Sequence, residues 1–322
     1  MHRRHLLVMP ALAAPFLSRG AAAQARPVVR VVVGSPPGGG VDTSARIFGE
    51  AVGPALGETW VVETRTGANG SIGSALVARS DPDGRTLMCN SDSHLLTRGV
   101  MKSVPFDPIA DFTPISRLIV SPLVLVGAPN LAARDMAALL AEVRARPDRH
   151  SFANTSLGTS GHLATEVFRL EAGVPLLIVT YRGTGPALQD VVGGQTSLMM
   201  APLVSALSLI QGGRLRAYCV TGGKRAAVAP EIPSAEEVGM PALAPIAPWF
   251  ALWGPKGLPA ASVTRIYDAV QAAARTEDIR RKVSELGGEA VIGETPDAFG
   301  ALAVETTARG LSILQRAGVQ PE

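Results

Sequence analysis

Hydrophobic residues along the chain alternate between short β-branched runs and longer stretches with helical spacing. The first unit begins with the run VVRVVV at residues 28–33, continues through the turn SPPGGG and reaches Asp42. After Asp42, apolar residues recur at the spacing of a helix face, at Ala45, Phe48, Val52 and Leu56. This unit predicts a strand, a glycine-rich turn and a helix.

The same alternation continues to the C-terminus. We expect further strands at residues 60–64, 86–89, 123–126, 151–153, 176–181, 198–200, 215–220, 249–253 and 290–292. We expect further helices at 137–143, 163–170, 186–192, 204–210, 262–274, 277–286 and 296–317, and one that carries Ile72, Leu76 and Val77. Short strands alternating with helices predict an α/β fold of parallel sheets with helices on both faces.

The pattern also predicts two lobes. The strand–helix series restarts after residue 126, and a Pro-, Ala- and Glu-rich connection at 224–248 precedes a late return strand. The chain would then cross between the lobes near 122–129 and again near 244–254. We place a hinge at the strands 123–126 and 249–253.

The N-terminus has the three-part layout of an export signal. Arg3 and Arg4 precede an apolar stretch at residues 6–17, and the sequence Ala-Gln-Ala at 23–25 supplies a cleavage site. Residues 1–25 are therefore predicted to be a signal peptide, which would place the mature chain in the periplasm of a two-membrane cell. The adjacent arginines leave the twin-arginine route open beside the Sec route.

Charge and composition argue against two classes of partner, nucleic acids and the interior of a membrane. The whole chain carries 30 Lys and Arg against 27 Asp and Glu, but residues 1–25 hold three arginines and no acid, so the mature part is neutral. A neutral body with 4% aromatic residues argues against nucleic acid as a partner. Beyond the N-terminus, no apolar run reaches the roughly 18–20 residues that span a bilayer.

Two cysteines remain in the mature chain, and both lie in apolar, strand-like runs. Cys89 stands in TLMCN and Cys219 in RAYCV. We expect buried free thiols, because free cysteine packs as a small hydrophobe. A disulfide is the alternative in an oxidising compartment.

The turn SPPGGGVD at residues 35–42 is the first candidate binding element. A glycine-rich turn between a strand and a helix exposes backbone N–H groups at a positive helix end, which suits an anion. The turn lacks the spacing of a dinucleotide fingerprint and the Lys of a Walker loop. A purely structural turn is the alternative, with Asp42 as the helix N-cap.

Two further turns also follow strands of the predicted second lobe. The segment NTSLGTSGHL at 154–163 offers three hydroxyls at a helix start, and YRGTGPA at 181–187 follows the next strand. Ligands bind at the carboxyl ends of strands in open α/β sheets. Turns that face each other from two lobes predict a carboxylate clamp. Asp92 and His94 also follow a strand, where they would either line the cleft or form a solvated turn.

The sequence argues against catalysis and against a metal or cofactor. It holds no G-x-S-x-G elbow, and Ser160 and His162 stand two residues apart, a spacing that does not bring side chains together on a helix. His162 and Glu166 have the i, i+4 spacing of a metal pair, but histidines and cysteines are few and scattered. We therefore expect no catalytic residue, no metal and no cofactor.

These motifs together resemble the Bug family, the periplasmic receptors of tripartite tricarboxylate transporters. The resemblance rests on PPGG-x-x-D at 36–42, E-x-R-x-G-A-x-G at 63–70, PDG-x-T-L at 82–87, VPFDPIADFTPIS, GTSGHLATEVF, YRGTGPALQDVVGGQ and WFALWGPKGLPA. It implies the type II periplasmic binding protein fold, with two α/β lobes joined by two crossing strands. Lobe 1 would comprise residues 26–124 and 249–322, and lobe 2 residues 125–248.

The resemblance also implies a function and a set of binding residues. A small carboxylate (a di- or tricarboxylate, an amino acid or an aromatic carboxylate) would be held in the cleft, largely by backbone amides and bound waters, for a two-subunit membrane transporter. Carried onto this chain, the loop positions are Ser35, Pro37, Gly38, Gly39, Asp42, Gly158, Thr159, Ser160 and His162. The second lobe would add Tyr181, Arg182, Gly183, Pro186 and Ala187. A monomer would suit this role.

The chain departs from the family pattern in two places. TSLMMAP stands at 196–202, where many relatives carry V-D-L-M-F-D, and SDSH stands at 91–94. Ser91 and Asp92 therefore join the predicted binding residues, at the variable end of the ligand, and the identity of the ligand stays open. A receptor that presents its ligand to a membrane sensor, and a periplasmic hydrolase, are the alternative functions.

Overall fold

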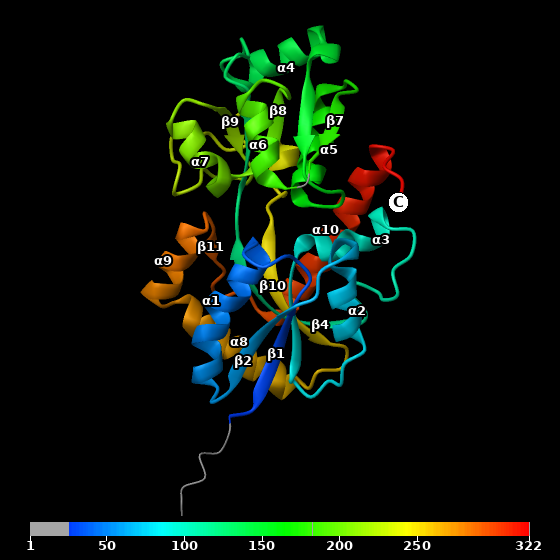
Figure 1. The fold of residues 1–322 in the computed structure, drawn as a ribbon, viewed down its shortest axis with the longest axis vertical. Coiled ribbons are helices and arrows are strands. Elements are labelled where there is room, and N and C mark those ends of the chain that lie inside the picture. Colours follow the sequence, from blue (N-terminus) through cyan, green and yellow to red (C-terminus); the bar gives the residue numbers. More distant parts are fainter. Residues whose placement is uncertain (1–25, 182, 322) are drawn as a thin grey trace, which may run out of the picture.

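The computed structural model describes residues 26–181 and 183–321, which form two α/β lobes, one above the other in Figure 1. The predicted signal peptide lies outside the described residues. No helix of the described part combines the length and the apolar character of a membrane span.

The first lobe is built on a six-stranded sheet in the order β11-β4-β10-β3-β1-β2. Its strands are β1 (Val28–Val33), β2 (Thr59–Thr64), β3 (Thr86–Ser91), β4 (Phe112–Val120), β10 (Trp249–Pro255) and β11 (Glu289–Ala290). The accompanying helices are α1 (Gly40–Ala55), α2 (Ser71–Ala78), α3 (Thr97–Val100), α8 (Ala260–Ala274), α9 (Glu277–Glu285) and α10 (Pro296–Arg316), with the 3₁₀ turns η1 (Ala68–Gly70) and η2 (Asp92–Leu96).

The second lobe is built on a five-stranded sheet in the order β7-β6-β8-β5-β9. Its strands are β5 (Leu123–Gly127), β6 (Ser151–Asn154), β7 (Leu177–Thr180), β8 (Leu198–Pro202) and β9 (Arg216–Val220). Its helices are α4 (Met136–Ala145), α5 (Ser160–Ala172), α6 (Thr184–Val192) and α7 (Leu203–Gln211), with the 3₁₀ turns η3 (Pro147–Arg149) and η4 (Pro241–Leu243).

Both sheets are mixed, which corrects the prediction of parallel sheets. Strand β10 is antiparallel to β3 and β4, and β5 is antiparallel to β8 and β9. The reason is the connection between the lobes: β5 and β10 each enter a sheet from the other lobe, so they run against the strands of the local βα units. The two-lobe α/β architecture itself is confirmed.

The nine-residue strand β4 was not predicted from the sequence. Its segment FTPISRLIV contains Pro114, and proline inside a run argues against a central strand because it donates no ladder hydrogen bond. In the fold, Pro114 lies opposite Trp253 of β10, at a position where the register of the ladder shifts. The irregularity accommodates the proline.

The chain passes between the lobes at residues 121–122 and 247–248. Leu123 and Val124 already pair with Pro202 and Ala201 of the second sheet, so β5 lies wholly in the second lobe. Strand β10 likewise pairs only with strands of the first sheet. The expected hinge strands 123–126 and 249–253 are therefore interior strands, and the predicted lobe boundary at 124 falls inside β5. The Ser121 N–H donates to Pro248 O at 2.9 Å and ties the two crossings together.

Helix α10 packs against both lobes. Near its start, Phe299 packs with the tryptophans of β10 in the core of the first lobe. Near its end, Ile313 and Leu314 share one buried cluster with Leu163 of α5. Gly310 permits the close approach of α10 to η2 of the first lobe, because a Cβ there would lie 2.6 Å from Leu96 Cδ2. Apolar contact therefore joins the lobes along one side of the molecule.

The two cysteines are buried and free, as predicted. Cys89 lies in β3 of the first lobe and Cys219 in β9 of the second. Burial raises the pKa of the Cys219 thiol to about 12, and it raises the pKa of Cys89 as well. Neither thiol carries the thiolate character of a reactive cysteine.

Candidate functional site

The predicted binding turns lie at the carboxyl ends of strands that meet between the lobes. The turn at 34–39 follows β1, the segment 91–94 follows β3, and the turns at 155–159 and 181–183 follow β6 and β7. In Figure 1 the start of α1 lies at the level where the two lobes meet. The topology therefore brings together turns that are up to about 150 residues apart in the sequence.

The turn before α1 is shaped by a buried carboxylate. Asp42 accepts hydrogen bonds from the Gly38 N–H and from Arg46 Nε and Nη2, each at 3.0 Å. The hydrogen bond from Arg46 holds the pKa of Asp42 below its usual range. Gly39, and not Asp42, is the N-cap of α1. Because both carboxylate oxygens are occupied, Asp42 supports the turn and has little capacity left for a ligand.

The same turn leaves donors unused. Helix α1 has no side-chain N-cap, so the N–H groups of its first turn lack an acceptor from a capping residue. Beside them, the buried Ser35 Oγ has no hydrogen-bond partner among the described residues. Gly38 holds a φ of 77°, which favours glycine, and it is exposed together with Pro37. The arrangement suits an anionic oxygen placed over the start of α1.

The turn before α5 is closed by its own side chains. Thr159 is the N-cap and accepts from the His162 N–H at 3.2 Å. His162, which is 1% exposed, accepts the Gly158 N–H on Nδ1 at 3.2 Å. Its Nε2 lies 3.5 Å from Glu166 Oε1, a carboxylate that Arg169 Nη1 also contacts at 2.8 Å. His162 therefore fixes the turn and is not free to contact a ligand.

Asp92 and Ser160 contact each other across the lobes. Ser160 Oγ donates to Asp92 Oδ2, and both residues are buried. Burial raises the pKa of Asp92 to about 6, while the hydrogen bonds from Ser160 and from backbone amides act in the opposite direction. The Ser91 hydroxyl bonds to that of Ser93 at 2.7 Å. In this conformation the side chains of Asp92 and Ser160 bond to each other, and neither is exposed to a ligand.

In the turn before α6, backbone groups are more available to a ligand than side chains are. Tyr181 directs its hydroxyl to Asp190 Oδ2 at 2.8 Å, and Ala187 is fully buried. Gly183, at a φ of 112°, begins α6 without a side-chain cap, and Pro186 in the first turn is exposed. Arg182 lies outside the described residues. The exposed backbone at the start of α6 is the available binding feature of this segment.

One inter-lobe contact comes from residues that were not predicted. Asn69 donates through Nδ2 to Leu157 O of the second lobe at 3.4 Å. Asn69 and Ala68 have φ values of 53° and 45°, in the left-handed region, and strained backbone of this kind concentrates at functional sites. The dipeptide Asn-Gly at 69–70 was the available signal in the sequence.

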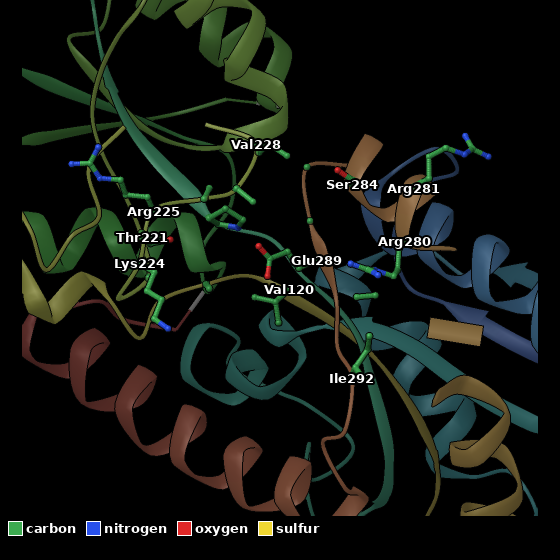
Figure 2. A pocket seen from close by; sticks show the side chains of 18 of the residues that line it. Val120, Thr221, Lys224, Arg225, Val228, Arg280, Arg281, Ser284, Glu289 and Ile292 are labelled. Atoms are coloured by element: carbon green, nitrogen blue, oxygen red, sulfur yellow. The ribbon is translucent and has the colours of Figure 1, made fainter. Parts of the chain in front are cut away.

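A separate groove lies on the other side of the crossing segments (Figure 2). It encloses 1220 Å³ between the segment after β9 and the end of α9 with β11. Figure 2 shows Lys224 and Thr221 on one wall and Arg280 and Glu289 on the other. None of the predicted binding residues lines it. Strands β4, β5 and β10 separate this groove from the turns described above.

Comparison with known families decides the family of the chain. Residues 44–319 match the model of the tripartite tricarboxylate transporter family receptor. The chain belongs to this family. Its members are solute-binding receptors and not enzymes, and the expected resemblance is confirmed.

Individual relatives are similar to this chain over most of its length. Protein BugT of Bordetella pertussis is 33% identical over 298 residues, which cover 92% of this chain and 90% of BugT. The structure of the periplasmic binding protein BugD matches with a TM-score of 0.77 and 30% identity, covering 91% of this chain and 98% of BugD.

Two similar solved structures contain ligands. Rpa4515 of R. palustris, with adipate, has a TM-score of 0.80 and 29% identity, and covers 92% of this chain and 98% of its own. MatC of Rhodopseudomonas palustris, with bound malate, has a TM-score of 0.76 and 28% identity, and covers 89% of this chain and 98% of its own. Both ligands are dicarboxylates.

Proposed function

We propose that this receptor captures a small carboxylate, with dicarboxylates as the first class to test, between its lobes and delivers it to a two-subunit membrane transporter. The observation that carries the proposal is the start of α1, where an uncapped helix terminus lies beside the unpartnered Ser35 hydroxyl. Charge-assisted hydrogen bonds from such donors are stronger than neutral ones. The malate and adipate in two similar structures support the same ligand class.

In this proposal one carboxylate of the ligand sits over the turn at Ser35, Gly38 and Gly39. The start of α6 at Gly183 and Pro186 approaches the ligand from the second lobe. Asp42, Thr159 and His162 act indirectly, because their polar atoms hold the two turns in shape. No arginine needs to enter the pocket, since the helix termini supply the positive potential.

Lobe closure would complete the site. We place the hinge at the two crossings, residues 121–122 and 247–248, where the chain leaves one sheet and enters the other. Paired crossings limit the motion to bending and twisting, with hinge residues absorbing the change in backbone angles. The predicted signal at residues 1–25 and the similarity to the periplasmic binding protein BugD support a periplasmic location for this cycle.

A thermal-shift panel tests the proposed function. We expect at least one of malate, succinate, adipate, citrate, an amino acid or an aromatic carboxylate to raise the melting temperature. A ligand at about 100 times its Kd stabilises the folded state by roughly 2.7 kcal/mol. The same samples should not hydrolyse carboxylic esters. Ester hydrolysis without stabilisation by any carboxylate would contradict the receptor proposal and favour the hydrolase alternative.

A further inference from the structure

The contact between Asp92 and Ser160 joins two elements that belong to different lobes. Asp92 begins η2 directly after β3, and Ser160 is the first residue of α5. Asp92 is 6% exposed and Ser160 is 4% exposed, so the hydrogen bond between their side chains is shielded from water. Shielding strengthens such a bond, because little solvent competes for it.

Opening of the lobes would expose this carboxylate. Ser160 and Leu163 of α5 lie over Asp92 and line the same cavity, and α5 moves with the second lobe. In the open state the carboxylate would be hydrated and would titrate near the ordinary value for Asp, about 3.9. Burial disfavours its ionised form. The closed and open forms therefore differ in their affinity for one proton at this position.

Charged groups around the contact are already neutralised. Arg117 of β4 and Arg309 of α10 line the same 80 Å³ cavity as Asp92 and Ser160. Arg117 is paired with Glu294, and Arg309 is paired with Glu305. On α5, Glu166 holds Arg169 and lies next to His162, and on η2 the His94 ring bonds to Ser74 and Pro108. No ion pair to Asp92 forms among the described residues.

We propose that Asp92 is a positioning residue, which locks the Thr159–His162 turn of the second lobe against the first, and that proton uptake by its carboxyl group strengthens this lock. The proposal rests on the lobe closure of the proposed function. It changes the role expected for Asp92: the side chain sets the position of a binding turn through Ser160, and does not contact the ligand itself.

The direction and size of the effect follow from the two titrations. The pKa of Asp92 is about 6 in the closed form. With about 3.9 in the open form, the ratio of closed to open molecules should rise roughly tenfold as the pH falls from about 7 to about 5. Acidification would favour the closed form, since the closed form binds the proton more tightly.

The test measures lobe contact directly and needs no ligand. Spin labels at Ile72→Cys on α2 and Leu177→Cys on β7 report the distance between the lobes, because both positions are exposed and lie on different lobes. Cys89 and Cys219 are buried and should stay unlabelled. Protein with no further substitution should show a roughly tenfold rise in the ratio of close-distance to long-distance molecules on acidification.

Three variants separate the proposal from other pH effects. Asp92→Asn mimics the protonated carboxyl, so it should show a high close-distance population that does not change with pH. Ser160→Ala should lower this population at both pH values, since it removes the donor. Asp81→Asn, at an exposed acid with no hydrogen bond, is the matched control and should behave as wild type. A pH-independent wild-type population, or equal pH dependence in Asp92→Asn, would overturn the proposal without affecting the thermal-shift result.

Discussion

The substitution Gly39→Val gives the sharpest test of the binding turn before α1. Gly39 has φ −71° and ψ 162°, which lie in a region open to any residue, so no backbone strain opposes the change. A Cβ here would lie 3.2 Å from Pro36 O and 3.8 Å from Ser35 Oγ. The two methyl groups of valine would then occupy the space beside the unpartnered hydroxyl.

The expected losses differ between stability and binding. Valine is a poor N-cap, so the folded state should lose about 1 kcal/mol. Each charge-assisted hydrogen bond that the ligand can no longer reach is worth roughly 1.5–3 kcal/mol. Loss of one such bond weakens binding by more than about tenfold. Binding should therefore suffer far more than folding.

Calorimetry with the best ligand of the panel measures the affinity, and urea unfolding measures the stability. Thr295→Val is the matched control, because Thr295 is the N-cap of α10 and accepts the Ala298 N–H at 3.2 Å. It should cost about 1 kcal/mol of stability and leave binding unchanged. If Gly39→Val binds as tightly as wild type while Arg182→Ala loses binding, the proposal that the start of α1 holds the carboxylate is refuted. A pocket centred on Arg182 would then replace it.

Two further predictions concern buried titratable groups that the proposed binding does not use. Burial lowers the pKa of His94 to about 4, so its contribution to stability is present above the ordinary value of 6.5 and is lost as the pH falls through 4. His94→Gln should remove up to roughly 3 kcal/mol of pH-dependent unfolding free energy over this range, and an unchanged pH profile in urea unfolding would contradict this. Cys89 and Cys219 should resist thiol reagents in the folded protein and react only in denaturant, whereas rapid native labelling would show that one of them is accessible.

The local βα units could be predicted from the sequence, because each carries its own periodicity. The first unit shows this well, since the run at 28–33 and the apolar face through Phe48 match β1 and α1. Strand direction could not be predicted, because it depends on which lobe a strand enters from. Strand β4 was missed for a different reason, since the tolerance for Pro114 comes from an irregular ladder with β10.

The positions of the turns at the ends of strands could be predicted from the sequence, but the contacts of their side chains could not. Four of the predicted binding side chains form hydrogen bonds within the protein through their polar atoms. They are Asp42, Ser160, His162 and Tyr181. Buried polar groups need such partners. The partner of Ser160, Asp92, is 68 residues away in the sequence, so the sequence alone could not reveal this contact. The other partners are near in the sequence, and one of them has a plain signal: Arg46 has the i, i+4 spacing from Asp42 of an ion pair on one helix.

The position of β10 has a consequence for how the polypeptide acquires its fold. This strand lies between β3 and β4 in the first sheet, although it follows them by more than about 120 residues in the sequence. The second lobe is continuous in sequence and can form once its own residues are available. The first sheet stays in two parts until β10 arrives, and such non-local pairing is slow. A chain that emerges from its N-terminus would therefore complete the inserted lobe before the lobe that it began.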